Sequence, residues 1–170
     1  MAGKGRTVRL LQALLTWAGT SGWQVCPLSP ESLSPWRQLA VASPGDLSWE
    51  LLEHCLANGR IGVAVLDLDD PISRYWQEAG LTPCITYSEN KNQADLVAKN
   101  LTVLPGGMIQ FEVLAQGTLS RVRLDRRICS LYEALNIMAC ALAAGIPART
   151  SAAFFQRLSG NKTTASCYHL

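Results

Sequence analysis

The chain has 170 residues, of which 48% are hydrophobic and 16% are charged. This length and composition fit one globular domain with a buried core, and they exclude an intrinsically disordered or collagen-like chain. The 15 basic and 13 acidic residues leave a net charge of +2, which is too small to indicate a nucleic-acid partner.

The first half of the sequence predicts alternating helices and strands. Apolar residues recur at three- and four-residue spacing over residues 7–20, which predicts a helix with one broad apolar face. After a proline- and serine-rich connection, we expect a strand at 38–42 and a helix that Asp46 caps and that runs to Leu56. The continuous apolar run at 61–66 is typical of a strand covered by helices on both faces. This order favours an α/β fold with a parallel sheet.

The second half predicts a helix and a strand, then a group of strands, then two helices. Asp70 is expected to cap a helix that ends near residue 79, and a short strand is expected at 84–87. Strand-like segments follow at 94–104, 108–114 and 118–125, which predict a small antiparallel sheet. A long helix that begins near 128 is expected to end at Gly145, and a shorter one to end near 158.

The sequence carries no convincing signal for zinc, membrane or secretion. Its six cysteines are scattered without a C-x-x-C pair, which disfavours a structural zinc site. No stretch approaches the roughly 20 apolar residues of a membrane span, and no secretion signal is convincing. Arg121 and Arg123 alternate with apolar residues, as on a solvated strand face. We therefore expect a cytoplasmic protein that binds neither membrane nor nucleic acid.

Several pieces of the sequence, taken in order and spacing, resemble the second half of the Mur ligase central domain. They are 65–71 (VLDLDDP), 85–88 (ITYS), 94–101 (ADLVAKNL), 111–113 (FEV), 131–135 (LYEAL) and 141–147 (ALAAGIP). The resemblance is strongest to UDP-N-acetylmuramyl-tripeptide synthetases, and it covers about residues 60–160. It implies a trimmed P-loop-type central domain at 1–160, shortened between about 23 and 45, with a C-terminal tail at 161–170.

The resemblance also implies a chemistry. Mur ligases use ATP and Mg²⁺ to phosphorylate a carboxylate of a UDP-linked muramyl peptide, a peptidoglycan precursor, and the amine of an amino acid then attacks the acyl phosphate. Gly5, Arg6 and Thr7 correspond to the end of the family's phosphate-binding G-x-x-G-K-[ST] loop. Ser130 and Glu133 stand where the family places asparagines beside the adenine. These five residues are the predicted nucleotide-binding set.

The sequence departs from the Mur ligase pattern at its chemical positions. Ala2 replaces the first loop glycine, Arg6 replaces the loop lysine, and Leu47 stands in place of a metal-binding histidine. No lysine lies between Arg37 and Lys91 to match the family's carbamylated lysine. We therefore predict no catalytic residue and no metal ligand. The prediction is a Mur-ligase-like protein, formally an ATP-dependent amide-forming ligase, that is inactive as an isolated chain.

Other interpretations stay open. The chain is alternatively a non-catalytic interaction module, or the remnant of a shortened gene. The family's third domain is expected just after residues 158–160, where only 161–170 remain. A partner chain that supplies this domain, or a homodimer formed through apolar surface that the domain would cover, is therefore also expected.

Overall fold

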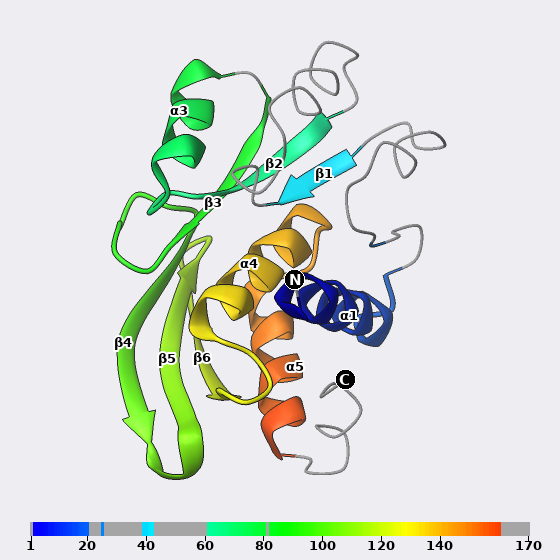
Figure 1. The fold of residues 1–170 in the computed structure, drawn as a ribbon, viewed down its shortest axis with the longest axis vertical. Helices are drawn as coiled ribbons and strands as arrows, with labels where there is room; N and C mark the ends of the chain where they lie inside the picture. The colour runs from blue at the N-terminus through cyan, green and yellow to red at the C-terminus, as the bar shows by residue number, and fades with distance from the viewer. Residues whose placement is uncertain (1, 21–24, 26–38, 43–60, 81, 161–170) are drawn as a thin grey trace.

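The computed structural model describes residues 2–20, 25, 39–42, 61–80 and 82–160. These residues form a sheet with helices packed against it (Figure 1). The expected helix after Asp46, the position of Leu47 and the tail at 161–170 lie outside the described residues. No helix within the described ranges is long and apolar enough to cross a membrane.

The described strands form one six-stranded mixed sheet in chain order. They are β1 (Leu39–Ala42), β2 (Ile61–Asp67), β3 (Cys84–Ser88), β4 (Leu96–Leu104), β5 (Met108–Ala115) and β6 (Thr118–Asp125). Strands β1 to β4 are parallel, and β5 is antiparallel to both β4 and β6. The predicted α/β fold with a parallel sheet is therefore confirmed. The antiparallel strands continue the parallel ones within the same sheet, because β4 pairs with both β3 and β5.

Four described helices cover this sheet: α1 (Ala2–Trp17), α3 (Pro71–Ala79), α4 (Leu131–Ala143) and α5 (Ala148–Gly160). Helix α4 packs on β2 and β3, with α1 and α5 beside it, while α5 also packs on β6 (Figure 1). Helix α3 contacts β2. The molecule is thus organised around α4, which carries buried residues on most of its surface.

Strand β2 is buried on both faces, as its apolar run predicts. Val65 is fully buried in the same core as α4. Ala64 and Leu66 are also fully buried, and they project to the opposite face because side chains alternate along a strand. The amphipathic helix α3 packs on β2 and contributes Trp76, which is fully buried.

The main core joins side chains of α1, α4 and α5 to those of the sheet, including the antiparallel strands. Ile109, Phe111 and Val113 of β5 are buried, whereas Gln110 and Glu112 between them are only partly buried. This alternation confirms the half-buried strand that the sequence predicts. Leu135 and Met138 of α4 and other large apolar side chains fill the space under these strands; these are Val122, Leu124, Phe155, Leu10 and Leu14.

The end of α4 also follows the prediction. Gly145 has φ 82°, in the left-handed region that favours glycine, and its N–H donates to the carbonyl of Leu142. The N–H of Ile146 donates to Ala141, at 2.9 Å, so the chain closes the helix and turns into α5. Both helices are held against the sheet by this short connection.

Candidate functional site

Three of the five predicted nucleotide-binding residues meet where α1 lies against the first turn of α4. Arg6 Nη2 lies 2.8 Å from both Oε1 and Oε2 of Glu133, and Arg6 Nε lies 3.3 Å from Oε1. The planar guanidinium therefore holds the carboxylate through both of its oxygens, which is the strong geometry for this type of ion pair. Leu10 and Leu14 of α1 are fully buried and fix the helix beside α4.

Ser130 joins the same network as the residue that caps α4. Its Oγ accepts a hydrogen bond from the Glu133 N–H at 3.1 Å, and Glu133 Oε2 accepts from the Ser130 N–H at 2.9 Å. The Ser130 hydroxyl also lies 3.0 Å from Oε2. Such a reciprocal capping box satisfies backbone N–H groups that the first helical turn would otherwise leave without partners. We call Arg6, Ser130 and Glu133 the junction network.

The junction network stabilises Glu133 in its charged form. The side chain is only 14% exposed, and burial alone would raise the pKa of Glu133. Hydrogen bonds from Arg6 and Ser130, together with the charge of Arg6, outweigh burial and bring the pKa of Glu133 below its ordinary value. At neutral pH the site therefore presents a carboxylate, which only accepts hydrogen bonds and which repels phosphate.

Gly5, Arg6 and Thr7 do not form a loop. The sequence predicts that the helix begins at Thr7, but α1 begins at Ala2 and includes all three residues. Only the first few N–H groups of a helix lack an internal partner, so these three residues lie beyond the N–H groups that could face a phosphate. Two features favour the helix here: Ala2 lacks the conformational freedom of the loop glycine, and Arg6 ties the first turns of α1 to the distant Glu133.

A second polar group lies at the carboxyl end of β2 and β3. Asp69 accepts hydrogen bonds from the Ser88 hydroxyl and from the Glu89 N–H, at 2.9 and 2.8 Å. Asp70 accepts from the N–H of Ser73 at 3.1 Å, which confirms it as the cap of α3. Burial raises the pKa of Asp67, and the neighbouring Asp69 and Asp70 add to this effect. These hydrogen bonds give the aspartates a structural role in holding the loops.

The junction network does not fit a bound nucleotide in this arrangement. Arg6 is already paired, Glu133 is negative, and the backbone at 5–7 is helical. Within the described ranges, no group of three or more histidine, cysteine or acidic side chains is arranged to hold a metal ion. The residues of the junction network, as they are paired here, therefore do not fit ATP with Mg²⁺.

Comparison with known proteins finds similarity to Mur ligases over part of the chain. The chain is 31% identical over 80 residues to a UDP-N-acetylmuramoyl-L-alanyl-D-glutamate–2,6-diaminopimelate ligase from Geobacillus thermodenitrificans. This match covers 47% of the chain and 16% of the relative. Over about half of its length, the chain is thus similar to this Mur ligase. No protein-family model matches the chain.

The solved structure of one Mur ligase shows a similar fold over part of the chain. A UDP-N-acetylmuramoyl-L-alanyl-D-glutamate–2,6-diaminopimelate ligase superposes with a TM-score of 0.51 at 21% identity, over 64% of this chain and 23% of the ligase. A crystal structure of MurF from Acinetobacter baumannii gives a TM-score of 0.47 at 21% identity, over 56% of this chain and 21% of MurF. This chain thus spans less than a quarter of the length of the relatives that it matches, 16% of the Geobacillus ligase and 23% of the first solved structure.

The sequence analysis identifies Arg6 and Glu133 separately but misses that they bind each other. They are 127 positions apart, so no local pattern connects them. The resemblance does offer one signal for this contact. Arg6 and Glu133 both depart from the Mur ligase pattern, and the resemblance assigns both positions to the same nucleotide. Opposite charges at two such positions indicate a contact between them.

Proposed function

We propose that this Mur-ligase-like chain is a scaffold domain that does not catalyse amide formation by itself. The observation that carries the proposal is the ion pair of Arg6 with Glu133, at 2.8 Å, tied to the Ser130 cap. The relatives are ligases that act in the making of peptidoglycan precursors, and the chain is proposed to serve a related cytoplasmic process. The ATP and Mg²⁺ that the resemblance implies are not part of the proposed function.

The physical argument starts from what a nucleotide would have to displace. A phosphate could bind Arg6 only by competing with a carboxylate that holds the guanidinium through two oxygens. Glu133, whose side chain is only 14% exposed in the ion pair, would lose its cation and lie near the incoming negative charge. Both changes oppose nucleotide binding. The resemblance therefore supports a Mur-ligase-like fold, while the junction network argues against a bound nucleotide at these residues.

The proposal is tested by titrating ATP with Mg²⁺ into the purified chain. We expect no saturable heat and no thermal stabilisation at millimolar nucleotide, because a ligand that binds the folded state raises its stability. Saturable binding, or amide formation by the isolated chain, would contradict the proposal. The matched variant combines Arg6→Lys with Glu133→Asn, which restores the family's residue types at both positions. The double variant Arg121→Lys with Glu112→Gln, on strands β6 and β5, is the control.

A second candidate is an interaction module, and exposed apolar side chains favour it. Leu101 and Val103 of β4 are 53% and 68% exposed, and Tyr75 of α3 is 57% exposed. Such residues support a partner, either another chain that carries the third ligase domain or a second copy. Light scattering across a concentration series distinguishes these cases. A monodisperse monomer at high concentration excludes the homodimer, and co-purification with a chain that carries the third ligase domain supports the partner.

A further inference from the structure

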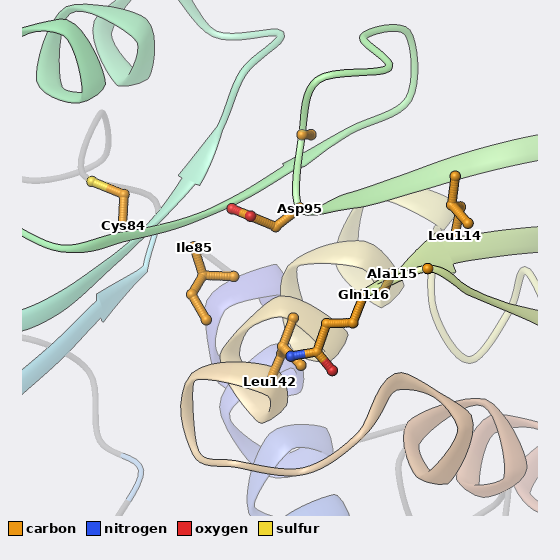
Figure 2. Close-up of a pocket in the computed structure, with 9 residues that line it drawn as sticks. Cys84, Ile85, Asp95, Leu114, Ala115, Gln116 and Leu142 are labelled. Carbon is orange, nitrogen blue, oxygen red and sulfur yellow. The ribbon is translucent and has the colours of Figure 1, made fainter.

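A pocket of about 480 Å³ opens where strands β3 and β4 diverge, away from the junction network. The two strands pair only through Tyr87 with Leu96 and Ser88 with Val97, so the first residues of β3 have no β4 residue beside them. The pocket is lined by residues of β3, of the segment before β4, of the end of β5 with the turn that follows it, and of α4. They are Cys84, Ile85, Ala94, Asp95, Leu114, Ala115, Gln116, Gly117 and Leu142 (Figure 2).

The backbone of β3 is open toward this pocket. The carbonyls of Pro83 and Tyr87 accept hydrogen bonds from Ala64 and Leu68, so alternate residues of β3 face β2. The main-chain groups of Cys84 and Thr86 therefore face the other side, where β4 has not yet begun. Asp95 takes the place of the missing strand at Thr86, because Asp95 Oδ2 accepts from the Thr86 N–H at 2.8 Å.

Asp95 also gives the pocket a negative charge. It is the one charged side chain among the lining residues that the structure describes, and Figure 2 shows its carboxylate directed toward β3. Asp95 Oδ2 accepts hydrogen bonds from the Thr86 N–H at 2.8 Å and from the Thr86 hydroxyl at 2.7 Å. Burial raises the pKa of the Cys84 thiol, and the charge of Asp95 raises it further, so the negative potential extends into the pocket.

The floor of the pocket is apolar. Ile85 points toward α4, and Leu142 and Gln116 lie next to it in Figure 2. An aliphatic chain can lie on Ile85 and Leu142, while a cation at its end meets the carboxylate of Asp95. The volume is within the range of about 300–1,000 Å³ that small-ligand sites occupy.

We propose that this pocket binds a primary ammonium group on a short aliphatic chain next to a peptide bond, as in a lysine residue of an extended peptide. The methylenes lie on Ile85 and Leu142, the ammonium group binds Asp95, and the peptide bond pairs with the main chain of Cys84. This site is independent of the proposed function, because it shares no residue with the junction network.

The test uses N-acetyl-lysine N-methylamide as the probe, and N-acetyl-norleucine N-methylamide as the matched probe without the charge. Backbone amide shifts of the full chain are followed by NMR during each titration. We expect the lysine probe to shift residues 84–86, 94–95 and 114–117, with about threefold to fivefold tighter binding than the norleucine probe. Equal binding of the two probes, shifts at other residues only, or no shifts at millimolar probe would overturn the proposal.

Two variants sharpen the test. In Asp95→Asn the amide oxygen can still accept from Thr86, while the amide nitrogen removes the charge, so the preference for lysine over norleucine should disappear. In Ala94→Phe the new ring takes up space in the pocket that Ala94 lines, and binding of both probes should be lost. Glu78→Gln on α3 is the control for a general loss of negative charge. A preference for lysine that survives Asp95→Asn in a chain with unchanged melting temperature would contradict the assignment of Asp95.

Discussion

Helix α4 meets the rest of the molecule in two different ways. Along its length it packs through apolar side chains on the sheet and on α5, while its first turn meets α1 through the polar junction network. The apolar region involves many residues, each of which follows a local pattern. The junction depends on three residues and on one contact between distant parts of the chain. The fold therefore depends on many residues and tolerates the change of a few. The position that the resemblance assigns to a nucleotide depends on three residues, so a few substitutions alter what it can bind.

The largest expected effect is in the apolar region. Phe111→Ala removes a fully buried ring from the main core under β5, and we expect the free energy of unfolding to fall by about 3–5 kcal/mol. Gln110→Ala, one residue earlier on the outer face, should change it by less than about 0.5 kcal/mol. Urea titrations of the two variants measure this difference. Equal losses would contradict the assignment of the inner face.

A smaller effect is expected at the junction network. Glu133→Ala removes both the partner of Arg6 and half of the capping box, so we expect a loss of about 1–2 kcal/mol. A double-mutant cycle with Arg6→Ala isolates the ion pair, and a coupling of about 0.5–1 kcal/mol is expected for a partly exposed pair. Additive losses from the two single variants would contradict a direct Arg6–Glu133 interaction.

The junction also makes a specific contribution to the pH dependence of stability. The folded pKa of Glu133 lies below its ordinary value of 4.5, so its stabilisation is fully present above that value and is lost as pH falls through the folded pKa. The stability difference between the wild type and Glu133→Gln should therefore shrink in acid.

Asp67 has a raised pKa, mainly through burial, so its charge costs stability above its ordinary pKa of 3.8. Asp67→Asn should accordingly gain on the wild type as pH rises, and the same dependence in both variants would contradict these assignments.

The smallest effect is expected on the outer face of the sheet. Arg121 Nη2 lies 3.3 Å from Glu112 Oε1, but the Arg121 side chain is 60% exposed. Pairs of this kind contribute little because solvent screens them. Arg121→Ala should leave the urea midpoint unchanged within the error of the measurement. A clear loss would mean that this ion pair resembles the junction pair more than its exposure indicates.

Most of the fold could be predicted because its determinants are local. The apolar run of β2, the alternation in β5, the Asp70 cap and the end of α4 at Gly145 each depend on neighbouring residues, and all are confirmed. The join of the antiparallel strands to the parallel sheet could not be predicted in this way. It depends on the pairing of β4 with β3, which brings together residues from separate segments.

The candidate site could be predicted only in part. The resemblance selects Arg6, Ser130 and Glu133, and the structure brings them together. The start of α1 is predicted wrongly, because a loop was expected where burial of Leu10 and Leu14 and the Arg6 ion pair favour a longer helix. The pocket at the divergence of β3 and β4 leaves no motif in the sequence, since its lining comes from four separate segments.

Arg6 and Glu133 bind each other at the position that the resemblance assigns to a nucleotide. The most direct test follows the Arg6 Nε–H signal by NMR with and without ATP and Mg²⁺. A signal that is protected from exchange, depends on Glu133 and stays unchanged at millimolar nucleotide is the predicted result. A saturable shift of the signal, together with loss of its protection as nucleotide is added, would contradict the account.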